Sequence, residues 1–316
     1  MDTASTITID QFNTLSDADC RADLVRCCGA TRWVDGMLAA RPFTSWGAVY
    51  QTACQIWWSL DPADWREAFD HHPQIGGDLA KLREKFASTV AWSAGEQSGV
   101  QQANEETLKT LAQGNRDYLA KFGYIFIVCA TGKSAAEMSA ILQARLPQDP
   151  TWEIFIAAEE QRKITFLRLE KWIGMPPQIE REIALVRLCD TDGRFVLQLR
   201  DDFDWIAWPN RWAMFGGGVE EGESPRIAAL RELAEELTFS PHDNRLFYRS
   251  SDVEAPNQAD QIKLLYQFDY LLEAEELNEA ILQEGQRFDR LTIAEIEQNE
   301  KDGHTVAPNH RRMLLR

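Results

Sequence analysis

The chain has 316 residues, a formal net charge of -17 at pH 7 and 44% hydrophobic residues. This length predicts two domains, and the composition is that of globular proteins. So acidic a chain repels nucleic-acid phosphates and anionic membrane surfaces, so we expect neither as a partner. An anionic substrate would then need a local arginine, a local lysine or a bound metal ion.

The sequence shows neither a secretory signal nor a membrane-spanning segment, and its cysteines suggest no metal site. The first residues lack a basic segment followed by an apolar core, and no run of about 18 apolar residues would span a membrane. The six cysteines form no CxxC pair and show no zinc-ligand spacing. We therefore expect free thiols in a cytoplasmic protein, and a homodimer is compatible with the sequence.

Up to about residue 173 the apolar pattern is mostly helical. Leu108, Leu111 and Phe122 recur at helical spacing, and residues 134–137 have the form of a capping box at the start of another helix. The apolar run at 122–130 is the exception, because propensity alone favours a short strand there, at 124–128.

A break at Gly174-Met175-Pro176-Pro177 separates two regions, because neither proline continues a helix. We therefore predict one domain at 1–173, a linker at 174–181 and a second domain at 182–316.

The second region mixes strands with a helix. Residues 183–188 and 194–199 are β-rich and flank a turn at 190–193, which predicts a hairpin. Residues 262–268 predict another strand, and a strongly helical segment follows a glycine cluster. This mixture predicts an α/β or α+β sandwich.

The helix after the glycine cluster carries three close acids. Ser224 is a good N-cap, and Pro225 suits the first turn. One apolar face is expected, made of Ile227, Leu230, Leu233, Ala234 and Leu237. Glu232, Glu235 and Glu236 follow at i, i+3 and i+4 and are expected on the opposite face, where hard divalent cations favour such oxygen clusters. Three glutamates alone are explained as well by a solvated acidic face paired with arginine.

Together with the residues before it, this helix resembles the Nudix box. The matching positions are Gly217, Glu223, Arg231, Glu232, Leu233, Glu235 and Glu236. The resemblance implies an α/β/α sandwich that hydrolyses a nucleoside diphosphate linked to another moiety, with Mg²⁺ or Mn²⁺ as cofactor.

The same resemblance implies roles for individual residues. The metal ligands would be Gly216, Glu232, Glu235 and Glu236, of which Glu235 and Glu236 are also catalytic. Gly217, Glu223 and Arg231 would support them. A metal held there would neutralise phosphate charge and lower the pKa of the attacking water.

Some neighbouring residues depart from the motif or extend it. Thr238 stands where the motif ends its helix with glycine, so we expect a different helix end. Phe215 replaces the proline that is common before the glycines. Glu284 resembles a loop glutamate that supplies a base in some members, although a surface glutamate is the simpler explanation.

Three tryptophans, Trp205, Trp208 and Trp212, precede the glycines. They are suited to stack a nucleobase, and core packing explains such a cluster at least as often.

A second set of candidate site residues, most of them polar, is dispersed over the first region. It comprises His71, His72, Pro73, Gly76, Ser93, Glu96, Gln97, Asn115, Tyr118 and Arg168. A histidine, a carboxylate, an amide and a guanidinium suit the binding and protonation of a small nitrogen-rich anion. Each residue also has a structural explanation, because residues 93–96 have the form of a capping box, His72 suits a loop and Arg168 suits a helix surface.

Taken in order, these segments resemble the 2-oxo-4-hydroxy-4-carboxy-5-ureidoimidazoline (OHCU) decarboxylases. The resemblance runs from about Phe12 to Trp172 and includes Cys28-Gly29, Trp33 and residues 41–43. It implies an all-α domain in which residues 124–128 are a non-helical stretch that lines the substrate pocket, not a strand. It also implies that no metal or organic cofactor is needed and that the product is (S)-allantoin.

The decarboxylase resemblance names a catalytic pair and a set of substrate contacts. His72 and Glu96 would be catalytic. The substrate-binding residues would be Pro73, Ser93, Glu96, Gln97, Phe126, Ile127, Val128, Cys129, Ala130 and Arg168. Loss of CO₂ leaves electron density on the former carboxyl-bearing carbon, and donors aimed at this charge lower the barrier. His72 would move the proton.

These interpretations combine into a bifunctional enzyme that acts on two small molecules, a ureidoimidazoline of urate breakdown and a nucleoside diphosphate derivative. One alternative is a Nudix domain that only binds a nucleotide and regulates the decarboxylase, which the complete acidic set disfavours. Another is a non-catalytic first domain, which the joint presence of His72, Glu96, Gln97 and Arg168 disfavours.

Overall fold

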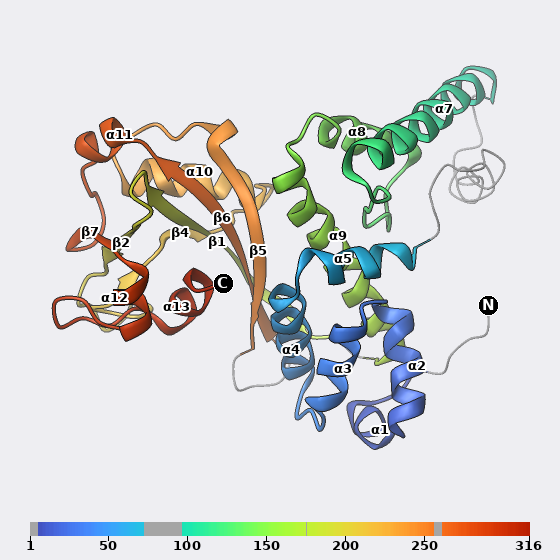
Figure 1. Ribbon diagram of the computed structural model, residues 1–316, viewed down its shortest axis with the longest axis horizontal. Coiled ribbons are helices and arrows are strands. Elements are labelled where there is room, and N and C mark those ends of the chain that lie inside the picture. The colour runs from blue at the N-terminus through green and yellow to red at the C-terminus, as the bar shows by residue number, and fades with distance from the viewer. Residues whose placement is uncertain (1–5, 73–96, 175, 256–260) are drawn as a thin grey trace. The chain divides into compact units, whose positions relative to one another are not determined.

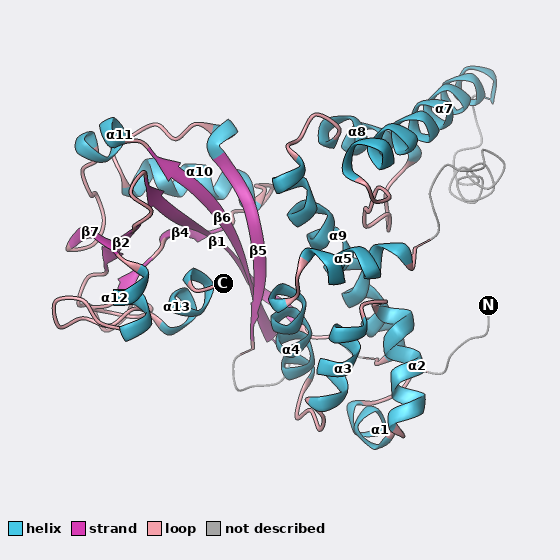
Figure 2. Ribbon diagram, viewed as in Figure 1, coloured by secondary structure: helices cyan, strands magenta, loops and turns pink. Residues whose placement is uncertain are grey.

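The computed structural model describes residues 6–72, 97–174, 176–255 and 261–316, with only the backbone at 97–104. The chain divides into two compact units (Figure 1). The first unit consists of Met1–Thr44 and Leu60–Pro176. The second unit consists of Ser45–Ser59 and Pro177–Arg316. Among the described residues the first unit is helical and the strands of the sheet lie in the second (Figure 2). In the described part of the chain, no helix is both long and apolar enough to cross a membrane.

Side-chain caps start several of the described helices of the first unit. They are α1 (Ile9–Thr14), α2 (Asp17–Cys27), α3 (Thr31–Ala39), α5 (Pro62–Asp70), α7 (Gln97–Phe122), α8 (Ala135–Arg145) and α9 (Pro150–Trp172). The predicted capping box at Ser134 and Glu137 starts α8, and Asp149 caps α9 ahead of its proline. Helix α9 packs against α2 and α5, while α7 packs against α8.

The apolar run between α7 and α8 forms no strand. Residues 125–130 have neither helical nor strand structure, although Phe126, Ile127 and Val128 are buried. The strand that propensity alone favours is therefore absent, because a strand needs a neighbour to pair with its backbone and this stretch lies among helices. The all-α fold implied by the decarboxylase resemblance is confirmed.

The second unit is built on one mixed sheet. Its strands are β1 (Gln178–Asp190), β2 (Phe195–Leu199), β3 (Trp212–Ala213), β4 (Phe215–Gly218), β5 (Leu246–Glu254), β6 (Gln261–Leu272) and β7 (Arg287–Leu291). The order is β3-β2-β1-β6-β5, with β4 also paired to β1 and β7 to β2. Strands β1 and β6 are parallel, whereas β1 and β2 form the predicted antiparallel hairpin, in which Gly193 has a φ of 76°. Strand β1 begins inside the stretch predicted as a linker.

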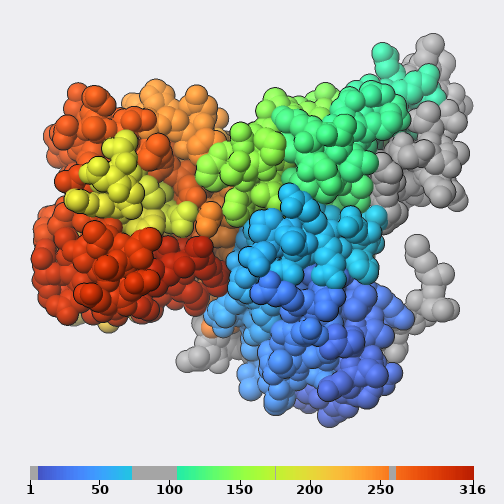
Figure 3. All heavy atoms as spheres, in the orientation of Figure 1, coloured from blue at the N-terminus to red at the C-terminus, as the bar shows by residue number. Residues whose placement is uncertain are grey.

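Helices cover both faces of the sheet. Ala184 and Val186 of β1 face a core shared with α10 (Pro225–Glu236), while Leu185 between them faces a core shared with α12 (Ile293–Gln298) and α13 (Pro308–Leu314). This alternation follows from the two-residue period of a strand. The unit also contains α11 (Ala274–Glu279). Figure 3 shows red atoms of the C-terminal segment of the chain on the face toward the viewer. The implied α/β/α sandwich is confirmed.

Helix α4 (Trp46–Ser59) belongs to the second unit although it lies within the first 60 residues. It packs on β5, where Trp58 Nε1 donates to Ser251 Oγ at 3.2 Å and the thiol of Cys54 lies 3.4 Å from the carbonyl oxygen of Ser251. No feature of the sequence predicts this pairing.

The buried face of α10 is rotated from the one predicted. Ile227 is 57% exposed, and Ala234 is also exposed, whereas Ala228 and Ala229 are fully buried. Glu236, expected on the solvent side, is only 4% exposed. Helical spacing identifies sets of residues on a common face, but the sheet decides which face is covered. The helix ends at Leu237 in an extended conformation, without the left-handed cap that Thr238 disfavours.

Candidate functional site

Arg231 lies at the centre of the acidic cluster on α10. Its Nε is 3.0 Å from Glu223 Oε1, and its Nη1 is 2.9 Å from Glu232 Oε1 and 3.0 Å from Glu235 Oε2. Its Nη2 donates to the carbonyl oxygen of Gly218 at 2.9 Å. One guanidinium thus holds two of the three helix acids, the preceding loop and the glycine strand together.

Other atoms approach the glycines of β4 closely, and at Gly216 these are backbone atoms that leave no room for a side chain. A Cβ atom at Gly217 would collide with the carboxylate of Glu232. Gly216 has a φ of 125°, and a Cβ atom there would collide with the carbonyl oxygen of Ala184 on β1. The glycine strand can therefore lie directly against both the sheet and the acidic helix.

The buried carboxylate of Glu236, at the end of α10, is held from two sides by strands of the sheet. The Gly216 N–H donates to its Oε2 at 2.8 Å, and the Gln198 amide on β2 donates to its Oε1 at 2.6 Å. Burial raises the pKa of Glu236 to about 7, and these two hydrogen bonds oppose that rise. Burial also raises the pKa of Glu232, whereas the bond from Arg231 lowers the pKa of Glu223.

The segment 282–286 passes along the edge of this cluster. The Gln283 N–H donates to the carbonyl oxygen of Glu236 at 2.9 Å, and Gln286 N–H donates to that of Leu199 at 2.9 Å. Between them, the charge of Glu284 contributes to raising the pKa of both Glu232 and Glu236. The structure therefore brings Glu284 to the acidic cluster.

Two residues of the dispersed set, His71 and Arg168, lie near the end of α2. His71 and His72 follow α5 directly, and the ring of His71 lies so close to Gly29 that a Cβ atom there would collide with it. The Arg168 guanidinium on α9 donates to the carbonyl oxygens of Arg26 and Cys27 at 3.1 and 3.2 Å. Segments far apart in the sequence thus meet at the α2–α3 corner.

Side chains from α8 and α9 fix the path of residues 126–130. Arg145 Nη1 donates to the carbonyl oxygen of Ile127 at 2.8 Å, and Glu160 Oε2 accepts a 2.7 Å bond from the Cys129 N–H. Lys133 Nζ donates to the carbonyl oxygen of Cys129 at 2.9 Å. Phe126 to Cys129 are buried, whereas Ala130 is half-buried.

Part of the predicted decarboxylase site lies outside the described residues. Pro73, Ser93 and Glu96 are among these positions, and of Gln97 only the backbone, at the first residue of α7, is described. The structure therefore does not test whether they meet His72 and Arg168.

Comparison with known proteins shows which families the two regions of the chain match. The sequence model of the OHCU decarboxylase family matches residues 13–170, which is half of the chain. The chain belongs to the OHCU decarboxylase family. Residues 179–314 match the model of the Nudix domain.

Two curated relatives match parts of the chain. The uric acid degradation bifunctional protein TTL of Arabidopsis thaliana is 41% identical over 148 residues, which are 46% of this chain and 44% of that protein. The 2-oxo-4-hydroxy-4-carboxy-5-ureidoimidazoline decarboxylase of Amia calva is 32% identical over 108 residues, 33% of this chain and 59% of that protein. The chain thus spans about half the length of these relatives.

A crystal structure of an OHCU decarboxylase in the presence of (S)-allantoin is 34% identical to this chain. The match covers 50% of this chain and 97% of the chain in that crystal structure, with a TM-score of 0.38.

The thiols of this OHCU decarboxylase family member are not suited to nucleophilic chemistry near α2. Burial raises the pKa of both Cys27 and Cys28 to about 12, so both are protonated at neutral pH. All six cysteines of the chain are free. The polar side chains described at this corner include His71, Arg168 and Glu67, whose carboxylate accepts hydrogen bonds from Thr31.

The donor set of the Nudix domain fits a hard divalent cation. Within the described residues, no group of three His, Cys, Asp or Glu side chains is already arranged around a common point. The Arg231 guanidinium lies between Glu232 and Glu235 and pairs with both carboxylates. Mg²⁺ and Mn²⁺ nevertheless prefer carboxylate and carbonyl oxygens as ligands, and the glycine strand lies close enough to the acids to add a backbone carbonyl oxygen.

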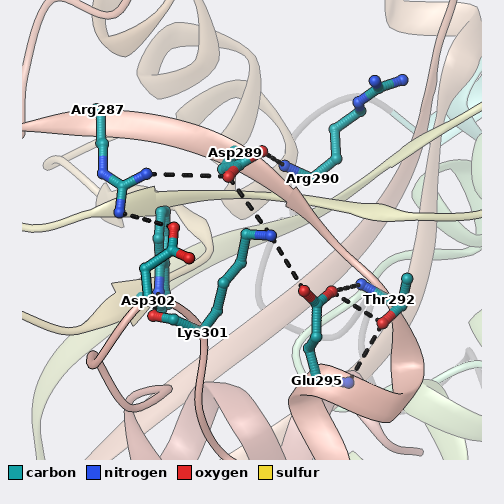
Figure 4. Close-up of polar contacts among 8 residues, drawn as sticks. Arg287, Asp289, Arg290, Thr292, Glu295, Lys301 and Asp302 are labelled. Atoms are coloured by element: carbon teal, nitrogen blue, oxygen red, sulfur yellow. Dashed lines mark hydrogen bonds and ion pairs between the residues drawn. The ribbon is translucent and has the colours of Figure 1, made fainter.

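Ion pairs fix strand β7, which follows the segment 282–286. Lys301 Nζ lies 3.0 Å from Glu295 Oε1 and 3.5 Å from Asp289 Oδ2, and Arg287 Nη2 lies 3.1 Å from Asp302 Oδ2 (Figure 4). The Lys301 carbonyl oxygen also accepts a 3.1 Å bond from the Trp212 indole. The network thus ties β7 to the turn at 301–302 and to β3.

The three tryptophans before the glycines have different environments. Trp212 is fully buried, and Trp208 has the Arg211 guanidinium 5.7 Å from its ring centroid. Trp205 is 80% exposed. Core packing explains Trp212 but not Trp205.

Sequence reasoning did not find Gln198, Gln283 or Gln286. Gln198 occupies one position of a strand that is buried throughout, so nothing but its polarity distinguishes it. The glycine at 285 was a signal for this segment in the sequence, because glycine often occupies positive-φ positions in the backbone. In the structure Gly285 has a φ of 95°.

Proposed function

We propose that the first domain, predicted at 1–173, decarboxylates 2-oxo-4-hydroxy-4-carboxy-5-ureidoimidazoline to (S)-allantoin in urate breakdown. The observation that carries this proposal is the match of the OHCU decarboxylase family to residues 13–170, which include His72, Glu96, Gln97 and Arg168. The names of the two curated relatives, from plant and fish, are consistent with the same step. No cofactor takes part in it, and six free thiols are consistent with a cytoplasmic protein.

The proposed chemistry assigns one task to each group. Arg168 attracts the carboxylate of the substrate, while Glu96 and Gln97 hold its ring N–H and ureido groups. The carbon–carboxyl bond at C4 breaks as CO₂ leaves, and its electron pair moves toward the adjacent C5=N bond, whose nitrogen takes up a proton, so that an enol forms. The C4 hydroxyl group then loses its proton to become the ring carbonyl, while His72 helps to deliver a proton to one face of the ureido-bearing C5, which gives a single enantiomer.

The decarboxylase proposal is tested with freshly generated substrate and circular dichroism, which follows the handedness of the product. We expect rapid formation of (S)-allantoin by the full chain. His72→Ala should lower the rate by at least about 100-fold, as general acid–base groups commonly contribute that much. His242→Ala, an exposed histidine of the other unit, serves as the control. A slow racemic product with the wild-type chain would refute the assignment.

We propose that the Nudix domain hydrolyses a nucleoside-diphosphate-type substrate with Mg²⁺ or Mn²⁺. The supporting observation is the convergence of Glu223, Glu232 and Glu235 on Arg231 beside the glycine strand. Glu232, Glu235, Glu236 and the Gly216 carbonyl would hold the ion. Once bound, it would neutralise diphosphate charge and activate water.

The protein groups prepare this reaction in three ways. Arg231 orients Glu232 and Glu235 through ion pairs of 2.9 and 3.0 Å. Gln198 and the Gly216 N–H hold the carboxylate of Glu236. Glu284, on the neighbouring segment, is available to accept a proton from the attacking water.

The hydrolase proposal is tested by Mg²⁺-dependent product formation from a panel of nucleoside diphosphate derivatives. Glu235→Gln should reduce kcat by at least about 100-fold, the size commonly seen when one charge-stabilising group is lost. Glu221→Gln, an exposed acid of the preceding loop, is the matched control. Nucleotide binding without turnover across the panel would instead support a regulatory module.

A further inference from the structure

Two aromatic side chains are stacked at the surface of the loop between β2 and β3. The rings of Phe203 and Trp205 lie 4.6 Å apart between centroids, with an angle of 8° between their planes. Trp205 is 80% exposed and Phe203 is 46% exposed. A flat, solvated aromatic pair is an uncommon feature of a protein surface, because burying its area would be favourable. It therefore suits a flat ligand.

Hydrogen bonds within the loop hold this pair in place. The Ile206 N–H donates to the Phe203 carbonyl oxygen at 3.2 Å, which closes a turn around Trp205. Arg200 Nε donates to the Ala207 carbonyl oxygen at 2.8 Å, and the Asn210 N–H donates to that of Asp201 at 3.1 Å. The pair is thus ordered before a ligand arrives, which lowers the entropy cost of binding.

The base of this loop lies beside the acidic cluster. Gln286 Nε2 donates to the carbonyl oxygen of Arg200 at 2.7 Å and lies 3.2 Å from Asn210 Oδ1. Three residues earlier, Gln283 N–H donates to the carbonyl oxygen of Glu236. Three residues of extended chain span at most about 10 Å. One short segment therefore connects the acids to the loop that carries the aromatic pair.

The charged residues next to the aromatic pair determine which part of a ligand can bind there. Asp201, Asp202 and Asp204 surround the two aromatic residues in sequence. The arginines of the loop lie at its two ends in sequence, where Arg200 Nε donates to the Ala207 carbonyl oxygen and the Arg211 guanidinium lies 5.7 Å from the Trp208 ring centroid. The carboxylates next to the aromatic pair disfavour phosphate oxygens there and accept hydrogen bonds from ring N–H and amino groups. The aromatic end of a diphosphate ligand fits this loop, and its phosphates do not.

We propose that Phe203 and Trp205 form a stacking platform for the nucleobase of the diphosphate substrate. This inference rests on the proposed hydrolase function and deepens it, because it specifies a substrate with a nitrogen-rich aromatic ring. The diphosphate lies at the acidic helix, and the ring lies over the exposed face of Trp205. Stacking of one base on an aromatic side chain is strong enough to change affinity about tenfold.

The test compares two non-hydrolysable probes that differ only in the nucleoside. Adenosine 5′-methylenediphosphate carries the base, and methylenediphosphonate does not. Their Kd values are measured by calorimetry with the full chain and Mg²⁺. Trp205→Ala should weaken binding of the adenosine probe about tenfold, equal to about 1.4 kcal/mol, and leave methylenediphosphonate binding unchanged. Trp205→Phe should restore most of the affinity, because a smaller ring still stacks.

Ile293→Ala is the matched control, because Ile293 is an exposed apolar residue at the start of α12 in the same unit. The platform is refuted if Trp205→Ala matches this control, if it weakens both probes equally, or if the wild-type chain binds neither probe. A base-dependent loss of affinity without turnover of any diphosphate would support the platform and refute the hydrolase instead.

Fluorine NMR gives an independent readout. With 5-fluorotryptophan incorporated, the Trp205 resonance is identified by its loss in Trp205→Phe. We expect the adenosine probe, but not methylenediphosphonate, to shift that resonance, while the resonance of buried Trp212 stays in place. If neither probe changes the chemical shift of the Trp205 resonance, the proposal is overturned.

Discussion

The side-chain amide of Gln198 on β2 donates a 2.6 Å hydrogen bond to Oε1 of Glu236 on α10, and both side chains are buried. The other oxygen of Glu236 accepts from the Gly216 N–H at 2.8 Å. A buried carboxylate with both oxygens bonded has little freedom to turn. Gln198 therefore decides how Glu236 faces the proposed metal position.

Gln198→Met should weaken metal binding by the Nudix domain about tenfold, because partners of metal ligands commonly contribute that much. The affinity for Mn²⁺ is measured by electron paramagnetic resonance with the full chain, so no turnover is needed. Gln267→Met is the matched control, since Gln267 is also buried in the sheet but bonds to Ser250 and to the Met313 carbonyl oxygen. Equal Mn²⁺ affinities for both variants would show that Gln198 has no part in orienting Glu236.

Arg145→Met should destabilise the helical unit by about 3–5 kcal/mol, the usual effect of removing one partner from a buried ion pair. Arg145 Nη2 lies 2.5 Å from Glu153 Oε1, and both side chains are almost completely buried. Burial raises the pKa of Glu153, and the pairing with Arg145 opposes this rise. Urea unfolding followed by the helical circular dichroism signal gives the free energy.

Two further variants identify the cause of this loss. Arg145→Met with Glu153→Gln should be less destabilised than Arg145→Met alone, because no uncompensated charge remains buried. Arg116→Met, on the exposed side of α7, should change stability by less than about 0.5 kcal/mol. A double variant as unstable as the sum of its single changes would contradict the ion-pair explanation.

Much of the fold follows from local patterns, and the exceptions have physical causes. The β1–β2 hairpin, the capping box of α8 and the end of α10 are determined by residues close in sequence. The conformation of 124–130 is not local, because Arg145 and Glu160 hold it from other helices. The same is true of α4, whose packing on β5 depends on residues about 200 positions away.

The acidic cluster was predictable from sequence because its members lie within one motif. Glu223, Glu232 and Glu235 do meet at Arg231. The supporting residues were not predictable, since Gln198 and Gln283 reach Glu236 only through the pairing of the sheet and the later segment. Spacing along one helix also cannot show that Glu236 is buried, because this depends on the neighbouring strands.

His310 should make the second unit sensitive to mild acid. Burial, together with the charge of Arg200, lowers the pKa of His310 to about 4. An unfolded histidine titrates near 6.5, so between these values the unfolded chain takes up a proton that the folded chain does not. The free energy of unfolding should therefore fall by up to about 3 kcal/mol as the pH drops from 6.5 to 4.

His310→Gln should remove this part of the pH dependence, because the glutamine amide can accept the 2.8 Å hydrogen bond that the Met214 N–H now donates to Nδ1. Calorimetric unfolding of the full chain from pH 7 to 4 measures the effect. His242→Gln, at an exposed histidine, should retain the wild-type slope. An unchanged slope in His310→Gln would mean that other groups cause the acid sensitivity.

Glu295→Gln should destabilise the network in Figure 4 by about 1 kcal/mol or less at neutral pH, the range of partly exposed ion pairs. The Thr292 N–H donates to Glu295 at 2.7 Å and Lys301 Nζ lies 3.0 Å away, so both lower the pKa of Glu295, to about 2. A lowered carboxyl pKa stabilises the fold above the unfolded value near 4.3, and this contribution is lost as the pH falls toward 2. The difference in unfolding free energy between wild type and Glu295→Gln should thus shrink from pH 5 to 3.

Glu297→Gln is the control, because Glu297 is an exposed acid on the same helix. Its difference from wild type should not change with pH in this range. A constant difference for Glu295→Gln would exclude the charge of Glu295 as the cause.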